Sequence, residues 1–432
     1  MNLVLRARWV FPVSAPPLEG GCVEIEPAGR VAAVGLRLGG SRMVDLGDVA
    51  LLPGLVNAHT HLELSTFERP LGSPGEPLPA WLRRIVAHGR AADEAEFCAA
   101  VERGWQQSAD AGTVALGDIG RTSAPARAAP SENAAPAGTN DLVSAVDRTE
   151  AAPRGADRPP GGVAFLELIA PTPERAAEVS RLADRYLTEA FALDRPGGPW
   201  RKGLSPHAPY SARFELIEEA VRLSAAYRVP MALHLAESLE EIALLHRGSG
   251  PMAEFLLGVG AGNIIGSLVG RRPIDYLVAM QTAHRALVIH GNYLDADEIE
   301  LLARHRAAMS IVYCPRSHAW FGHRPYPLDE LLRRGVRVAL GTDSRASSPD
   351  LDLWAEARRV LSAHGVGPGD VLRMATLWGA EALGVDDLWG SIAAGKRADL
   401  VSVALPTARA ADPNELLFDP RAGSPHPVCS RA

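Results

Sequence analysis

Between residues 55 and 362, short apolar runs alternate with amphipathic stretches in which apolar residues recur every three or four positions. Short apolar runs bounded by turns are typical of buried strands, and the amphipathic stretches are typical of helices. Repeated strand–helix units favour a parallel sheet, and eight such units are the number that a closed (β/α)₈ barrel requires. The predicted strands are Leu55–Ala58, Thr113–Gly117, Val163–Ile169, Gly203–Ser205, Met231–Leu235, Leu287–His290, Ser310–Tyr313 and Val336–Leu340. The clearest predicted helices are Glu94–Asp110, Glu174–Phe191, Phe214–Tyr227, Asp295–Arg304 and Leu353–Ser362.

The two ends of the chain have a different pattern. Residues 1–52 contain short β-like segments separated by Pro and Gly turns, at Leu3–Val10, Cys22–Ile25, Val31–Val34 and Val49–Leu52. A similar segment, Ala398–Val403, lies near the C-terminus. We therefore predict an α/β protein with a TIM-like barrel over residues 53–385 and a small composite β-sandwich from residues 1–52 and 386–432.

Residues 121–162 interrupt this organisation. The segment is rich in Ala, Pro, Ser and Gly and contains no aromatic residue. Such a composition buries too little apolar surface to offset the entropy lost on ordering. We expect a flexible surface insertion between the second and third barrel strands, with no part in the chemistry.

The composition excludes several function classes. The chain has 432 residues, a formal net charge of −7 and 22% charged residues, which argues against nucleic acid or an anionic membrane surface as its main partner. Its four cysteines, Cys22, Cys98, Cys314 and Cys429, are too far apart for a thiolate zinc motif or a disulfide framework. No apolar run approaches the ~18 residues of a membrane span. We expect a cytoplasmic protein.

Polar residues end several of the predicted apolar strands. His59 and His61 follow the first strand, His234 ends the fifth, His290 ends the sixth and Asp343 follows the eighth. In a parallel barrel all these strand ends face one mouth, which holds the active site. Three imidazoles and one carboxylate there form a ligand set suited to Zn²⁺ or another divalent transition metal. A hydrogen-bonded core histidine is the alternative for each residue alone, but the combination favours a metal site.

These motifs resemble a known family. The segment Pro53–His61, the His234-x-x-Glu237 pair, His290 and the segment Gly341–Ser344 resemble the amidohydrolase superfamily, in its cytosine-deaminase-like and chlorohydrolase-like branch. The tail Gly390–Val401 looks like the return strand of that family's β-sandwich. Three segments look most like 6-aminodeoxyfutalosine deaminases: His61–Ser65, Cys314–His323 and Asp343–Leu351.

The resemblance implies a hydrolytic deaminase with one divalent metal per chain, Zn²⁺ or Fe²⁺. Its implied ligands are His59, His61, His234 and Asp343. Dinuclear relatives carry a bridging lysine after the fourth strand, whereas here that strand ends in Ser205-Pro206-His207.

The resemblance also implies catalytic roles. Glu237 would carry protons between water and the substrate, His290 would orient the nucleophile, and Asp343 would help to deprotonate water. The alternative for Glu237 is a structural role, in which its carboxylate interacts favourably with the dipole of the helix that follows. The implied substrate is an aminopurine nucleoside or related N-heterocycle, with 6-aminodeoxyfutalosine of menaquinone biosynthesis as one candidate.

Substrate contacts are less clearly encoded. His207 matches a position that contacts substrate in relatives, and Trp81 could stack on a purine-like ring. Arg316 and Arg345 follow the seventh and eighth strands, where a guanidinium could clamp a substrate carboxylate. Further candidates, by position or as stacking faces, are Ser317, His318, Trp320, Phe321 and Tyr326.

Other functions remain open. Chlorohydrolase-like relatives displace halide or alkylamine, and the branch also contains guanine and methylthioadenosine/adenosylhomocysteine deaminases. The presence of Glu237 and His290 favours ammonia release, because a departing amine needs a proton donor. A non-enzymatic assembly module is the alternative of another class, although such relatives lose metal ligands. Relatives are often homodimers.

Overall fold

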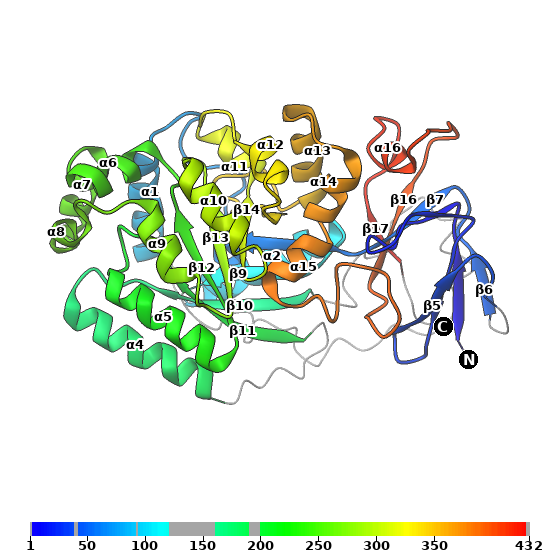
Figure 1. Ribbon diagram of the computed structural model, residues 1–432, viewed down its shortest axis with the longest axis horizontal. Coiled ribbons are helices and arrows are strands. Elements are labelled where there is room, and N and C mark those ends of the chain that lie inside the picture. Colours follow the sequence, from blue (N-terminus) through cyan, green and yellow to red (C-terminus); the bar gives the residue numbers. More distant parts are fainter. Residues whose placement is uncertain (1, 39–41, 92–93, 121–159, 190–198, 429–432) are drawn as a thin grey trace.

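The computed structural model describes residues 2–38, 42–91, 94–120, 160–189 and 199–428 (Figure 1). Most of the predicted insertion, residues 121–159, lies outside these described residues. The predicted C-terminal end of the insertion, residue 162, is wrong. Gly161 and Gly162 already belong to strand β10 (Gly161–Leu168) and pair with the preceding strand.

All eight predicted barrel strands are confirmed, and they form one parallel sheet in sequence order. The sheet curves until its first and last strands meet, where the backbone N–H groups of Thr342 and Asp343 both donate to the carbonyl oxygen of His59, at 3.1 and 3.2 Å. The barrel is therefore joined at the residues predicted to bind metal. The strands are β8 (Leu55–Thr60), β9 (Thr113–Gly120), β10, β11 (Trp200–Pro206), β12 (Pro230–Leu235), β13 (Arg285–His290), β14 (Met309–Tyr313) and β15 (Val338–Leu340).

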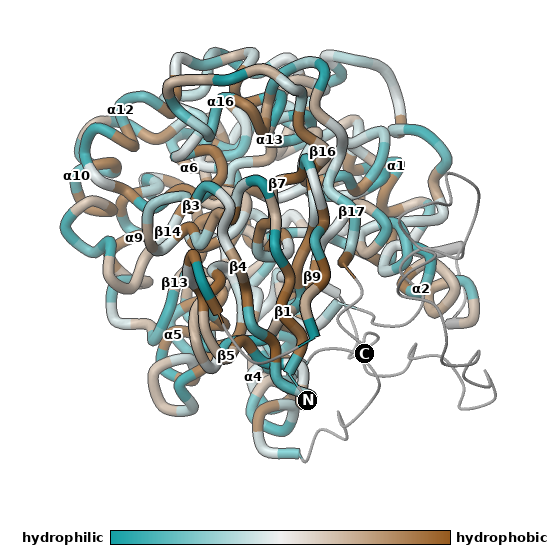
Figure 2. Tube along the Cα trace, turned by 90° about the vertical axis from the view of Figure 1, so that its right-hand side faces the viewer, coloured by the Kyte–Doolittle hydropathy of each residue, from teal (hydrophilic) through white to brown (hydrophobic). Residues whose placement is uncertain are grey.

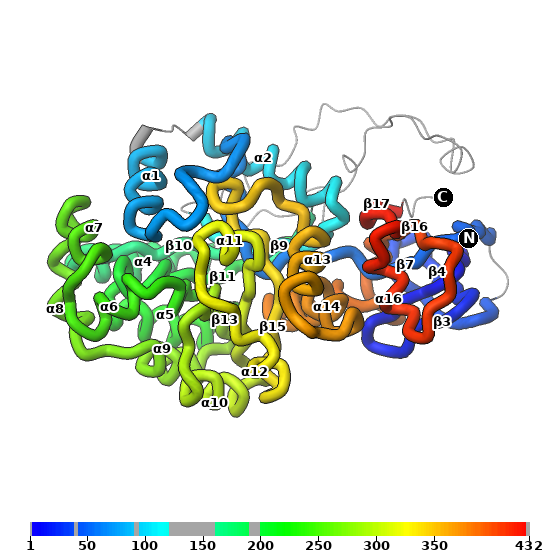
Figure 3. Tube along the Cα trace, turned by 90° about the horizontal axis from the view of Figure 1, so that it is seen from above, coloured from blue at the N-terminus to red at the C-terminus, as the bar shows by residue number. Residues whose placement is uncertain are grey.

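Helices surround this sheet (Figures 1 and 3). Several pack an apolar face on the strands, as α5 does with Leu216, Ile217 and Ala220. None of the described helices combines the length and apolar character needed to cross a membrane. The helices are α1 (Leu78–Ala91), α2 (Glu94–Asp110), α4 (Pro173–Thr188), α5 (Phe214–Tyr227), α6 (Leu239–Arg247), α7 (Pro251–Val259), α8 (Ile265–Leu268), α9 (Pro273–Met280), α10 (Ala296–Arg304), α11 (Pro315–Trp320), α12 (Leu328–Arg333), α13 (Leu353–Ala363), α14 (Pro368–Met374) and α15 (Leu377–Leu383).

Two small sheets lie beside the barrel (Figures 1 and 2); N-terminal strands alone build one, and strands from both termini build the other. One has the order β5-β4-β1-β6 and the other β17-β16-β7-β2-β3. The predicted strand Leu3–Val10 is two strands in different sheets, because the chain changes sheet at Ala7-Arg8, where Arg8 donates to the carbonyl oxygens of Pro406 and Ala408. The strands are β1 (Leu3–Arg6), β2 (Trp9–Val10), β3 (Leu18–Glu19), β4 (Cys22–Ile25), β5 (Val31–Gly35), β6 (Arg42–Asp45), β7 (Val49–Pro53), β16 (Leu400–Ala404) and β17 (His426–Val428).

The C-terminal tail is not wholly part of these sheets. Helix α16 (Pro413–Leu417) follows β16 and contacts α14. Its Leu416 and Leu417 join the apolar core of the barrel, and Phe418 stacks on Trp354 with ring centroids 4.5 Å apart. Residues 386–432 therefore serve both the sheets and the barrel, which the β-like pattern of Ala398–Val403 does not reveal.

Candidate metal centre and active site

Three imidazoles meet at the carboxyl end of the barrel strands. His59 in β8, His61 directly after it and His234 in β12 each offer a ring nitrogen, and these nitrogens lie within 4.8 Å of one another. The Nε2 atoms of His61 and His234 are 3.4 Å apart. This predicted convergence is confirmed, and three imidazoles at this spacing could hold a divalent transition metal.

The hydrogen bonds of these histidines fit a metal. His59 is fully buried, and neither of its ring nitrogens has a hydrogen-bond partner among the described residues. Leaving a buried polar atom unpaired costs about 1–3 kcal/mol, so such nitrogens are suited to a ligand. Nδ1 of His234 lies 2.8 Å from the carbonyl oxygen of His207, which fixes the proton on Nδ1 and leaves the Nε2 lone pair available.

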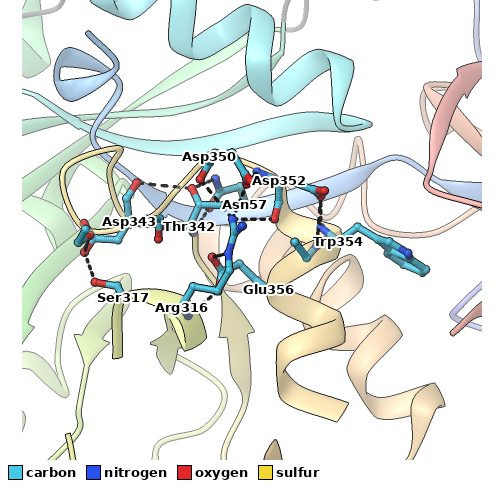
Figure 4. A network of polar contacts seen from close by, with 12 residues as sticks. Asn57, Arg316, Ser317, Thr342, Asp343, Asp350, Asp352, Trp354 and Glu356 are labelled. Atoms are coloured by element: carbon cyan, nitrogen blue, oxygen red, sulfur yellow. Dashed lines mark hydrogen bonds and ion pairs between the residues drawn. The ribbon is translucent and has the colours of Figure 1, made fainter. Parts of the chain in front are cut away.

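Asp343 approaches the three histidines from the last strand. Its Oδ1 lies 3.6 Å from Nε2 of His59, while its Oδ2 accepts hydrogen bonds from the hydroxyls of Ser317 and Ser347 at 2.7 and 2.8 Å (Figure 4). Burial opposes ionisation of this carboxyl, but the adjacent imidazole rings of His59 and His290 hold the pKa of Asp343 below its usual range. Asp343 thus offers an ionised oxygen beside the imidazoles.

Glu237 and His290 form a second pair at the same mouth. Oε1 of Glu237, in the loop after β12, lies 3.5 Å from Nε2 of His290, the last residue of β13. Burial, reinforced by the charge of Asp343, raises the pKa of Glu237 well above its usual range. A raised pKa favours the protonated carboxyl, the form that can donate a proton to a substrate.

The backbone around Glu237 is held on several sides. The buried carboxylate of Glu241 accepts the N–H groups of Ala236 and Glu237, each at 2.9 Å. Asn292 Nδ2 donates to the carbonyl oxygen of Glu237 at 2.9 Å. Ala236 has a left-handed backbone with φ of 54°, a conformation that costs about 1–3 kcal/mol and persists only where neighbours enforce it. The position of Glu237 is thus fixed by contacts outside the cavity.

The imidazoles at the mouth favour the neutral state. Burial, followed by the charge of His59, lowers the pKa of His61 to about 3 and that of His207 to about 4. Burial also lowers the pKa of His290 to about 3, against the opposing effect of Asp343. Since a metal binds the neutral imidazole, these rings need not lose a proton first near neutral pH.

A cavity of ≈ 340 Å³ lies over these groups. Its wall at the strand ends is polar, whereas its wall from α1 and α7 is mostly apolar, with His88 of α1 as an exception. The residues that line it are His61, Glu63, Leu64, Leu78, Trp81, Leu82, Ile85, Val86, His88, Gly89, Glu167, Ile169, Pro171, His207, Tyr210, Ser211, His234, Glu237, Phe255, Leu256, Val259, Ala261, His290, Asp343 and Ser344. Two of the substrate-contact candidates, His207 and Trp81, are among them.

The two candidate arginines do not line the cavity. Arg316 lies in an ion-pair network, with its Nε 2.6 Å from Oε1 of the buried Glu356 and its guanidinium 2.7 Å from Asp350 (Figure 4). Arg345 donates to the carbonyl oxygens of Phe67 and Glu68 at 3.0 and 2.6 Å. In the structure both guanidinium groups anchor the loops and helices around the mouth.

The remaining candidates do not line the cavity. The Ser317 hydroxyl donates a hydrogen bond to Asp343. His318 packs edge-on against Tyr313 and Tyr326, with ring centroids 5.7 Å apart in each case. Phe321 packs on Trp81 at 5.3 Å. Trp320 does not line the cavity either.

Sequence reasoning missed several residues of the site. Ser347, four residues after Asp343, holds the carboxylate, and Asn57, two residues before His59, accepts the N–H groups of His59 and Thr342 at 3.2 Å. A polar residue inside an apolar strand was the available signal for Asn57. Glu63 and the apolar residues of α1 and α7 gave no comparable signal, because their spacing is that of any packed helix or turn.

Comparison with known proteins identifies the family. The family model described as "Amidohydrolase family" matches residues 50–427. The chain belongs to the amidohydrolase family. An aminodeoxyfutalosine deaminase from Deinococcus radiodurans is 28% identical over 342 residues, which cover 77% of this chain and 73% of the relative. A 5-methylthioadenosine/S-adenosylhomocysteine deaminase from Syntrophobacter fumaroxidans is 28% identical over 413 residues, covering 91% and 80%.

A solved structure supports the same conclusion for this amidohydrolase. An adenosine deaminase from Xanthomonas campestris with bound zinc is similar with a TM-score of 0.66 and 25% identity, covering 99% of this chain and 93% of that one. Together with the deaminase relatives and the three-histidine group, it supports the predicted enzyme class, a metal-dependent hydrolytic deaminase acting on C–N bonds.

Proposed function

We propose that this amidohydrolase releases ammonia by hydrolysis from the exocyclic amine of an aminopurine nucleoside. The observation that supports the proposal most is the placement of the Glu237–His290 pair in the same cavity as His61, His234 and Asp343. A proton carrier beside a metal-ligand set is what hydrolysis with an amine leaving group requires.

We propose one Zn²⁺ per chain, held by His59, His61, His234 and Asp343. When bound, the cation supplies Lewis-acid chemistry that lowers the pKa of water to about 7. Zinc in a relative supports this choice over Fe²⁺. The chain supplies no lysine for a second metal, since the Nζ of Lys202 in β11 donates to the backbone carbonyl of Tyr186.

The chain's own residues would move the protons. Glu237 would take one proton from the attacking water and deliver it to the ring nitrogen. It would then take the proton of the hydroxyl that has added to the carbon and deliver it to the departing amine, so that ammonia leaves and a carbonyl forms. His290, 3.5 Å from Glu237, would orient the water and donate to the oxygen that develops negative charge. His207 and Trp81 would contact the base; Trp81 is held by its indole N–H, which donates to the carbonyl oxygen of Ala346 at 3.1 Å.

A coupled ammonia assay tests the proposal. The purified protein, stripped with a chelator and reloaded with Zn²⁺, should release ammonia from at least one of adenosine, 5′-methylthioadenosine, aminodeoxyfutalosine and guanine. The stripped protein should lose this activity. Release of halide from a chlorotriazine with no ammonia from any purine would favour a chlorohydrolase instead. A metal content below about a tenth of an equivalent and no activity would favour an assembly module.

A further inference from the structure

The part of the cavity away from the strand ends is lined mostly by apolar side chains. Helices α1 and α7, which pack against each other, contribute Leu82, Ile85, Val86, Phe255, Leu256 and Val259 to the lining. Figures 1 and 3 show the two helices side by side at the end of the barrel opposite the terminal sheets. Since the polar lining comes from the strand ends that would bind the reacting amine, α1 and α7 are left to contact the rest of the substrate.

The described lining of the cavity contains no lysine or arginine. Helix α1 contributes one imidazole, His88, and Glu63 and Glu167 are acidic. Arg83 of α1 is exposed; its guanidinium lies 5.8 Å from the ring centroid of Phe255 and does not line the cavity. A substrate carboxylate entering this space would lose water without meeting a guanidinium or ammonium group among the described lining residues, which disfavours binding.

We propose, on the premise of the function proposed above, that the substrate is an adenine nucleoside whose 5′ substituent is neutral and apolar. An alkyl or alkylthio group would exchange water for the side chains of α1 and α7, a favourable transfer. An aryl carboxylate of the aminodeoxyfutalosine kind would instead place its charge against the apolar side chains of α1 and α7. The lining thus assigns this chain a substrate class different from that of the 6-aminodeoxyfutalosine deaminases, which its motifs resemble.

Steady-state kinetics on the zinc-loaded protein test this inference. The ratio of kcat/KM for 5′-methylthioadenosine to that for aminodeoxyfutalosine should be about tenfold or more, the lower end of what pocket contacts achieve. A ratio of one or less, with ammonia still released, would overturn the inference and leave the proposed function standing. Ammonia from none of the purine substrates would overturn the proposed function, and the inference with it.

Two variants on α7 test whether this helix determines the substrate preference. Val259 lines the cavity and is half-buried, whereas Leu257 is 66% exposed and does not line it. V259R should shift the preference toward the carboxylated substrate by about tenfold, because it adds the missing cation. L257R, the same substitution on the same helix, should leave the preference unchanged. Equal preferences in the two folded variants would overturn the assignment of α7; if V259R does not fold, the wild-type ratio decides.

Discussion

Ser317 donates a hydrogen bond of 2.7 Å to Oδ2 of Asp343, the carboxylate oxygen that does not face His59. Ser347 donates to the same oxygen at 2.8 Å (the Ser317 contact is drawn in Figure 4). Two hydroxyls on Oδ2 fix the rotation of the carboxylate, so that Oδ1 stays beside the imidazoles. The orientation of a proposed metal ligand is therefore set by residues that do not line the cavity.

Removing either hydroxyl should weaken metal binding. S317A and S347A should each lower zinc affinity by roughly 10- to 100-fold, the usual effect of losing a partner of a metal ligand. Competition with a chromophoric chelator measures this. S348A is the matched control, because the buried Ser348 hydroxyl donates to the carbonyl oxygen of Thr342 rather than to Asp343. Equal zinc affinity in S317A and S348A would rule out the orienting role.

Arg316 should matter for stability. Its Nε and its backbone N–H both bond to the carboxylate of Glu356, which is fully buried. R316M keeps the backbone bond but removes the cation that pairs with this buried carboxylate, and should cost about 3–5 kcal/mol of unfolding free energy, measured by urea denaturation. R333A, which breaks an exposed pair with Glu330, should cost no more than about 1 kcal/mol.

Kinetics of R316M test the alternative, in which Arg316 binds the substrate. An unchanged unfolding free energy, combined with a raised KM for a carboxylated substrate only, would show that Arg316 binds substrate after all. The structure predicts the reverse pattern, since the guanidinium is already shared between Glu356 and Asp350.

The different outcomes for histidines and arginines show what one sequence can encode. His59 and His234 were predictable because each ends an apolar strand, and parallel strand ends must converge. The partners of Arg316 and Arg345 were not, because Glu356 lies 40 residues from Arg316, and the Phe67 carbonyl 278 residues from Arg345. An arginine near a strand end has the same local pattern whether it binds substrate or anchors a helix. Only the folded chain distinguishes the two.

Glu237 should be needed for turnover but not for metal binding. E237Q keeps the side-chain shape and removes the ability to carry protons, so kcat should fall by about 10²- to 10⁴-fold at unchanged zinc content. Metal analysis and the ammonia assay measure the two quantities. E240Q is the control, because Glu240 lies at the start of α6 and does not line the cavity. A kcat within twofold of wild type in E237Q would refute the proposed role.

Glu241 should make stability depend on pH. Burial raises its pKa from the ordinary 4.5 to about 7, although the N–H groups of Glu237 and Ala236 oppose this. A carboxyl with a raised folded-state pKa binds its proton more tightly in the folded than in the unfolded protein. Its contribution to stability is therefore full below pH 4.5 and is lost as pH rises to about 7.

E241Q removes this titration. The difference in unfolding free energy, E241Q minus wild type, should therefore rise with pH by roughly 3 kcal/mol between pH 4.5 and 7, since each unit of pKa shift corresponds to about 1.4 kcal/mol. Urea denaturation of both proteins after chelation measures it without a contribution from metal release. Other buried carboxyls, such as Asp118, titrate in both proteins and cancel in the difference. A constant difference across this range would mean that Glu241 stays ionised in the fold and supports the Glu237 loop as a charged anchor.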